Sequence, residues 1–194
     1  MKKDGRLQGK DFINIGIFTA IYFVIVFAVA CLGFIPIMMP FLAVFVPLIA
    51  GVPFMLYLTK ARKFGMLTIM GMILGIIMML MGPNWPTVIT GTVFGLLADL
   101  LMKSSGYQSV SKSVLANGIF SCWVWGQFIP MYINTNYYDN LATGYGQEYT
   151  QTLQGYMQPW VLPVLLVVCF VFGLLGGLLG KAILRKHFLK AGMA

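Results

Sequence analysis

The chain has 194 residues, of which 59% are hydrophobic and only 9% are charged. This composition excludes an ordinary soluble domain, because such domains carry about a quarter charged residues. The formal net charge of +8 would suit a nucleic-acid-binding protein, but the basic residues lie between or beyond long apolar stretches, which is typical of a membrane protein and argues against nucleic acid as a partner.

A helix needs about 20 apolar residues to cross the bilayer core, because its backbone polar groups must be bonded within the segment. Six stretches approach or exceed this length. We therefore predict an all-α polytopic membrane protein, a single domain over 1–194 in contact with the lipid bilayer. Its six transmembrane helices have the approximate bounds 12–34, 41–58, 64–81, 85–102, 114–133 and 160–184.

The thirteen Lys and Arg residues predict the orientation of these helices. If the N-terminus is inside, all thirteen fall on the cytoplasmic side, near the two termini or in the connections 59–63 and 103–113. The three connections on the other side carry none. This distribution predicts that both termini are cytoplasmic.

Candidate catalytic groups are scarce. The only histidine, His187, follows the last stretch among basic residues, and no His, Glu or Arg lies inside a stretch. Cys31, Cys122 and Cys169 lack the spacing of metal ligands and are expected to be small core residues. We predict neither enzymatic activity nor a metal site.

Asp99 is the one acidic residue inside a predicted helix. Such residues are candidates for function, because an unpaired charge inside the bilayer is costly. Asp99 lies one turn from the cytoplasmic end of its helix and four residues before Lys103. This spacing predicts an i,i+4 ion pair near the membrane interface.

Small residues recur at four-residue spacing, which flattens one face of a helix and lets another backbone approach. Gly16 and Ala20, near the cytoplasmic end of the first helix, leave open whether they pack within the bundle or dock a partner. Asn117 is predicted to form an interhelical hydrogen bond. The pairs predicted to pack within the bundle are Gly71 and Gly75, Gly91 and Gly95, Gly173 and Gly177, and Gly176 and Gly180.

The external connection 134–159 is long for this chain and, with Tyr132, holds six of the nine tyrosines, interleaved with Asn and Gln. One interpretation is an aromatic belt at the lipid headgroups. We prefer a lid over an external pocket for a flat ligand held by stacking and amide hydrogen bonds. The residues predicted to bind substrate are Asn84, Trp85, Trp123, Gln127, Tyr132, Asn134, Tyr138, Tyr149, Tyr156 and Trp160.

A family resemblance is carried by five segments: KDFINIGIFTA at 10–20, GVPFM at 51–55, KFGM at 63–66, VFGLLAD at 93–99 and KHFLKAG at 186–192. Together they resemble the Trep_Strep, or MptD-type, family of substrate-binding S components of energy-coupling factor (ECF) transporters. The resemblance implies an S-component-like bundle in the bacterial cell membrane that captures a micronutrient from outside. It also implies partners, namely a transmembrane T component, contacted through Gly16 and Ala20, and two ATPase subunits.

The expected ligand is a small, neutral or weakly charged aromatic vitamin or vitamin precursor, because Asp139 and Glu148 are the only charges on the external side. The chain is expected to have no cofactor of its own. Haem is an alternative ligand, since some similar S components are associated with haem uptake and Tyr or Met side chains can bind its iron. An alternative of another class is a stand-alone secondary transporter or channel, although the sequence shows neither a midplane charge nor an evident repeat.

Overall fold

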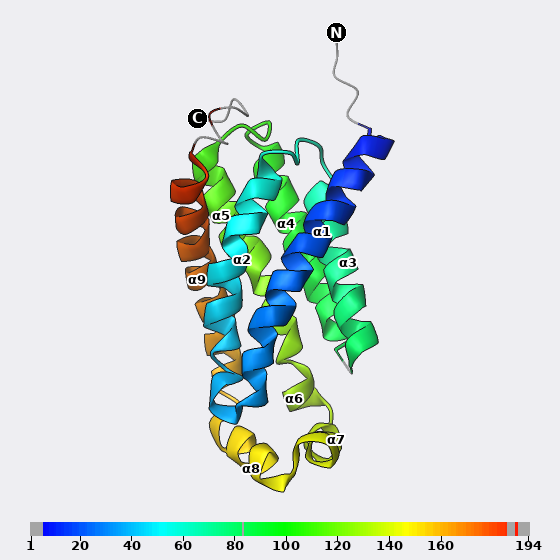
Figure 1. Ribbon diagram of the computed structural model, residues 1–194, viewed down its shortest axis with the longest axis vertical. Coiled ribbons are helices and arrows are strands. Elements are labelled where there is room, and N and C mark those ends of the chain that lie inside the picture. The colour runs from blue at the N-terminus through cyan, green and yellow to red at the C-terminus, as the bar shows by residue number, and fades with distance from the viewer. Residues whose placement is uncertain (1–5, 83, 186–188, 190–194) are drawn as a thin grey trace.

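The computed structural model describes residues 6–82, 84–185 and 189. In this part of the chain all the regular elements are helical, as predicted, and the long helices run side by side through an elongated bundle (Figure 1). In chain order the elements are α1 (Gly9–Ala30), the 3-10 helices η1 (Cys31–Phe34) and η2 (Pro36–Met38), α2 (Leu42–Leu58), α3 (Met66–Met81), α4 (Pro86–Lys103), α5 (Val110–Ser121), the 3-10 helix η3 (Cys122–Gln127), α6 (Pro130–Ile133), α7 (Tyr137–Tyr145), α8 (Gln147–Tyr156) and α9 (Val161–Ile183).

Three of the described helical segments are long and apolar enough to cross a membrane: Gly9–Phe34, Pro86–Lys103 and Val161–Ile183. Helices α2 and α3 are apolar but shorter, with 17 and 16 residues. The predicted fifth span, 114–133, is not one continuous helix, because α5 ends at Ser121 and the chain continues as η3 and α6. A 3-10 helix rises by about 2.0 Å per residue, so η3 still extends this segment along the bundle.

One end of the bundle collects the basic residues. The start of α1, the end of α9 and the α2–α3 and α4–α5 connections lie there, whereas α7 and α8 lie at the opposite end (Figure 1). Nine of the thirteen Lys and Arg residues belong to these segments. We call this the basic end and the opposite one the cavity end. The other four basic residues, together with His187, lie outside the described residues: Lys2, Lys3, Lys186 and Lys190.

The glycine pairs pack helices inside the bundle, as predicted. Gly71 of α3 faces Gly91 of α4, and a Cβ added to either would clash with the carbonyl of the other. On α9, Gly173 meets Ser121 of α5, and Gly176 meets the backbone of α2. The predicted interhelical bond of Asn117 is confirmed, since its Nδ2 donates to the carbonyl of Gly173 over 2.5 Å.

Gly16 and Ala20 differ from these pairs. A Cβ added to Gly16 would have no atom within 4 Å, apart from its own helix, and Ala20 is exposed. This face of α1 therefore points away from the bundle.

The Asp99 carboxylate binds the start of α3 instead of forming the predicted ion pair. Its Oδ2 accepts the backbone N–H groups of Gly65, Leu67 and Thr68, at 3.0, 3.1 and 2.9 Å, and the hydroxyl of Thr68 at 2.8 Å. Its Oδ1 accepts the hydroxyl of Tyr107 at 3.1 Å. A helix N-terminus offers unpaired donors and partial positive charge, which together stabilise a buried carboxylate.

Lys103, the predicted partner of Asp99, instead places its Nζ over the ring of Phe64, 4.9 Å from the ring centroid. The prediction of an ion pair between Asp99 and Lys103 is therefore wrong. A different ion pair forms at the same end of the bundle, where Lys63 Nζ lies 2.8 Å from Asp11 Oδ2 and joins α1 to the α2–α3 connection.

Cys122 and Cys169 are buried, as predicted, but Cys31 is exposed in η1, so its predicted place in the core is wrong.

An aromatic core fills the middle of the bundle. The rings of Phe54 and Phe120 stack with centroids 4.2 Å apart. Trp123 is fully buried, and its Nε1 donates to the hydroxyl of Tyr22 at 3.1 Å.

Candidate functional site

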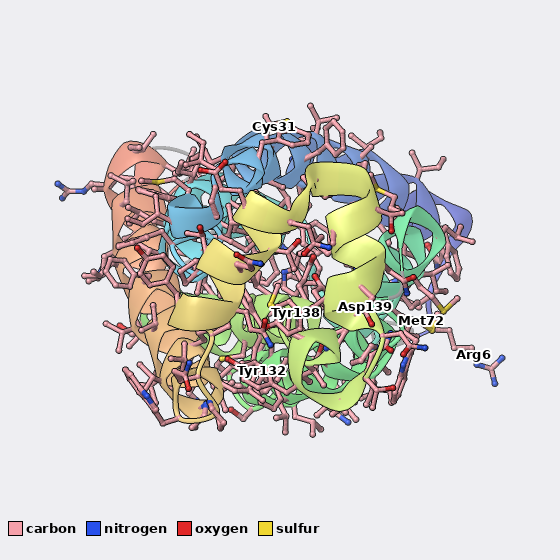
Figure 2. All side chains as sticks on the ribbon, turned by 90° about the horizontal axis from the view of Figure 1, so that it is seen from below. Arg6, Cys31, Met72, Tyr132, Tyr138 and Asp139 are labelled. Atoms are coloured by element: carbon pink, nitrogen blue, oxygen red, sulfur yellow. The ribbon has the colours of Figure 1, made fainter. Side chains whose placement is uncertain are left out.

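A cavity of about 350 Å³ lies at the cavity end. It is bounded by the end of α1 and η1, the start of α2, the α3–α4 turn, η3, and the α7–α8 hairpin. Seen from below, this hairpin crosses the end of the bundle (Figure 2). The hairpin therefore covers a cavity at one end of the bundle.

The hairpin is a pair of helices, although the sequence predicts a polar loop there. Gly146 joins α7 to α8 with a φ of 87°, a left-handed conformation that glycine adopts without steric cost. Thr150 and Leu153 are the buried residues of α8. The hydroxyl of Tyr149 donates to the carbonyl of Gly33 over 2.5 Å, which ties α8 to η1. This bond holds the hairpin down as a lid.

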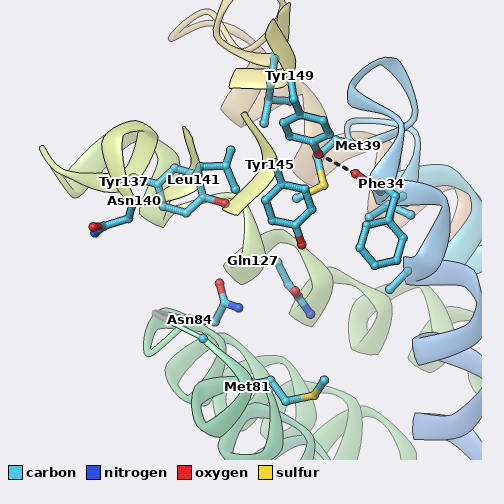
Figure 3. A pocket seen from close by; sticks show the side chains of 15 residues that line it. Phe34, Met39, Met81, Asn84, Gln127, Tyr137, Asn140, Leu141, Tyr145 and Tyr149 are labelled. Carbon is cyan, nitrogen blue, oxygen red and sulfur yellow. Dashed lines mark hydrogen bonds between the residues drawn. The ribbon is translucent and has the colours of Figure 1, made fainter. Parts of the chain in front are cut away.

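Aromatic rings form one wall of the cavity (Figure 3). The ring centroids of Phe34 and Tyr145 are 6.0 Å apart, and those of Tyr145 and Tyr149 are 5.0 Å apart. The interplanar angles are 33° and 31°. A series of rings inclined by such small angles offers a broad apolar surface on which a flat ligand can stack.

Of the three side-chain amides in the lining, Asn140 is exposed on α7 and the other two are partly buried. Asn84 comes from the α3–α4 turn and Gln127 is the last residue of η3, and both side chains lie below the hairpin (Figure 3). Neither amide forms a hydrogen bond with another of the described residues. Both are partly buried. They therefore keep donors and acceptors for a ligand.

The cavity is uncharged. None of the fifteen lining residues carries a side chain that is charged near neutral pH. Burial, reinforced by neighbouring tyrosines, raises the pKa of Tyr137 to about 12, and burial also raises the pKa of Tyr149. These hydroxyls stay protonated at physiological pH. The lining therefore suits a neutral ligand better than an anion or a cation.

A family model described as a hypothetical bacterial integral membrane protein (Trep_Strep) matches residues 9–190. The chain belongs to the Trep_Strep family. Neither a curated protein nor a solved structure matches the chain. Family membership supports the membrane embedding predicted from composition.

Within this member of the Trep_Strep family, three predicted binding residues line the cavity: Asn84, Gln127 and Tyr149. Trp123 lies in the aromatic core instead. Trp85, Tyr156 and Trp160 are 53%, 48% and 67% exposed and are outside the lining.

Three further predicted residues organise the hairpin without lining the cavity. The hydroxyl of Tyr132 donates to the carbonyl of Gln158 at 3.2 Å. Asn134 Oδ1 accepts the backbone N–H of Asn136 at 3.1 Å, just before α7. The ring of Tyr138 packs edge-on against Tyr137, with centroids 5.5 Å apart.

Other lining residues were not predicted as binding residues. Tyr145 and Tyr149 belong to different helices and meet across the Gly146 turn, so helical spacing does not account for their contact. Phe34 and Met39 come from the segment between α1 and α2, and Met81 ends α3. No pattern in the sequence marks these three as neighbours of the hairpin.

Proposed function

We propose that this chain is the substrate-binding S component of an ECF-type, ATP-driven importer in the bacterial cell membrane. In this proposal six spans cross the membrane, both termini are cytoplasmic, and the cavity end faces outward. The observation that carries the proposal is the uncharged, lidded cavity with an aromatic wall and the partly buried amides of Asn84 and Gln127. Its volume, near the lower end of the usual range of about 300–1,000 Å³, suits a compact aromatic ligand such as a vitamin.

The arrangement of the bundle supports a role in which this chain binds the ligand and partner subunits supply the energy. The outward-pointing face of Gly16 and Ala20 lies toward the basic end of α1, away from the cavity. A T component could approach the backbone closely there, because small side chains leave a flat surface. Two ATPase subunits would supply the energy, which fits the lack of a phosphate-binding Gly-rich loop in the sequence.

A secondary transporter is less well supported. Such carriers couple transport through buried ionisable groups. The buried carboxylate of Asp99 is bound to the start of α3 and to Tyr107, so its acceptors are occupied. Its contacts are those of a helix-capping residue.

Haem is a second candidate ligand, because Met39, Met81 and three tyrosines line the cavity and both residue types can bind haem iron. The lining offers no Lys or Arg to pair with the two propionates. A compact neutral aromatic molecule is therefore the better match.

The ligand can be identified from purified protein. Extraction into mild detergent, followed by denaturation and mass spectrometry, should release one neutral aromatic compound in near-stoichiometric amount. The Tyr145→Ala variant should carry much less of it. A Soret band in the absorption spectrum would select haem instead. A protein that retains no small molecule, and that is not stabilised by any fraction of the growth medium, would contradict the binding function.

The energy source needs a separate test. Co-expression with a T component and its two ATPases should give a stable complex, and uptake of the identified compound should require ATP hydrolysis. Uptake by the chain alone in proteoliposomes would contradict the S-component role and favour the secondary transporter.

A further inference from the structure

We propose that Asn84 and Gln127 together read the edge of a planar, uncharged heterocycle that carries a ring N–H beside a carbonyl oxygen. Lactams and cyclic imides have such an edge. This inference deepens the binding function proposed above and rests on it, because it names the chemical class that the same cavity selects.

The fold brings the two amides to the same place by a close backbone approach. Gly126, which precedes Gln127, packs against Thr87, which follows Asn84 by three residues. A Cβ added to Gly126 would lie 3.0 Å from Thr87 Cα, so a larger residue there would push the two segments apart. The hydroxyl of Thr90 adds a second tie, since it donates to the carbonyl of Trp123 in η3 at 3.0 Å.

The start of α4 also fixes the turn that carries Asn84. The hydroxyl of Thr87 lies within hydrogen-bonding distance of the carbonyls of Asn84, at 2.5 Å, and Gly75, at 3.2 Å. The backbone on either side of the cavity floor is therefore held by specific contacts. The two side-chain amides, by contrast, have no partner among the described residues.

An amide presents a donor and an acceptor side by side, so its best partner presents an acceptor beside a donor. The same complementarity lets Asn and Gln side chains pair in bidentate fashion with a nucleobase edge. Two such amides can bind two polar groups of one ring system. A partly desolvated amide without a partner is costly, and a ligand with the matching edge removes that cost.

The walls of the cavity set the other properties of the ligand. The neighbouring rings of Phe34, Tyr145 and Tyr149 favour a flat molecule. Carboxylates, phosphates and amines are disfavoured because no lining side chain is charged. Selection among flat neutral molecules therefore depends on the hydrogen-bonding edge.

The test compares pairs of compounds that differ only in this edge. Lumazine and xanthine carry ring N–H groups beside carbonyls, whereas 1,3-dimethyllumazine and theophylline keep the flat rings and lose those donors; the comparison is made at mildly acidic pH, where all four compounds are uncharged. Calorimetry on the full-length protein in lipid nanodiscs should show binding of lumazine or xanthine. The methylated partner should bind roughly tenfold more weakly or worse. Equal affinities within a pair, or no binding of either parent compound, would overturn the inference.

Variants identify the amide that reads the edge. Gln127→Met keeps the side-chain length but removes the amide. It should therefore weaken binding of the parent compound by roughly tenfold and leave binding of the methylated compound unchanged. Gln151→Met, on the exposed side of α8 and outside the lining, is the matched control and should change neither affinity. An equal loss for parent and methylated compounds in Gln127→Met would show that the residue shapes the cavity without reading the edge.

The two proposals can fail separately. If a neutral aromatic molecule without such an edge co-purifies and its uptake needs the ATPases, the S-component role stands and the edge inference is wrong. If the paired compounds bind as expected but uptake proceeds without ATPases, the edge inference stands and the S-component role is wrong.

Discussion

Among single residues, Asp99 makes the most hydrogen bonds of any described carboxylate. Oδ2 gathers three backbone N–H groups and the Thr68 hydroxyl, and Oδ1 accepts from Tyr107. The four-residue spacing from Asp99 to Lys103 is visible in the sequence. The start of α3, however, lies 31 to 34 residues earlier, and the two segments meet only because Gly95 lets α4 approach α3. Local spacing therefore could not predict the true partner.

Replacing Asp99 should destabilise the bundle without changing the cavity. Asp99→Asn keeps the shape but loses the charge-assisted bonds to the start of α3, so we expect a loss of about 2 kcal/mol in the free energy of unfolding. Thermal unfolding of purified protein in detergent measures it. Asp139→Asn, at an exposed position in α7, is the matched control and should have little effect. Equal melting temperatures for the two variants would show that the cap contributes little.

Tyr149 should control how firmly the lid closes. Tyr149→Phe keeps the ring but removes the hydrogen bond to Gly33, so ligand affinity should fall by about 1 kcal/mol, or about fivefold, mainly through faster release. Tyr156→Phe removes the hydroxyl of a half-exposed side chain on the same helix and should leave affinity and release rate unchanged. Stopped-flow release of the identified ligand distinguishes them. Identical release rates would mean that the hydroxyl does not hold the lid.

Among the helices, those with long apolar runs could be predicted from the sequence, because burial in lipid imposes both composition and length. The α7–α8 hairpin could not be predicted in this way. Helices α7 and α8 have only 9 and 10 residues, rich in Tyr, Asn, Gln and Thr, and form against η2 and the end of the bundle. Short polar helices depend on tertiary contacts, which a local pattern does not reveal. The cavity could be predicted only in part for the same reason, since Phe34 and Tyr145 meet across this fold.

Helices α3 and α4 approach so closely at Gly71 and Gly91 that a side chain at either position should destabilise the bundle. Gly71→Ala places a methyl group against the carbonyl of Gly91, so we expect a loss of about 1–3 kcal/mol in the free energy of unfolding and poorer expression. Gly16→Ala adds the same group where nothing lies within 4 Å, and should be neutral or slightly stabilising. Thermal unfolding in detergent tests the pair. A neutral Gly71→Ala would show that the two helices can separate at little cost.

For the whole molecule, the proposed orientation predicts which positions react from each side of the membrane. Exposed Cys31 is first replaced by Ala, while Cys122 and Cys169 are buried. Lys60→Cys and Gln108→Cys should then react with an impermeant maleimide only from the cytoplasmic side, and Asn140→Cys only from outside. Reaction of Asn140→Cys from the cytoplasm would reverse the orientation. Reaction of Lys60→Cys and Asn140→Cys from the same side would overturn the six-span topology.

Binding and energy coupling should be separable in the whole molecule. Replacing both Gly16 and Ala20 with Leu fills a flat face that points away from the bundle, so a T component could no longer approach closely. Uptake should fall to background while the affinity and melting temperature of the purified protein stay unchanged. Loss of both binding and stability would identify an internal contact, and uptake at the parent level would place the T component elsewhere.

The bond between Tyr149 and Gly33 has a mechanical consequence, because Gly33 lies just beyond the end of α1. Helix α1 has 22 residues and is therefore a stiff rod about 33 Å long. Its other end is anchored by the pair of Asp11 and Lys63. Because α1 is continuous between these two contacts, we expect a displacement of the lid to be transmitted along it toward the Gly16 and Ala20 face. In such an arrangement a partner that grips this face would sense an empty or a filled cavity through a single helix.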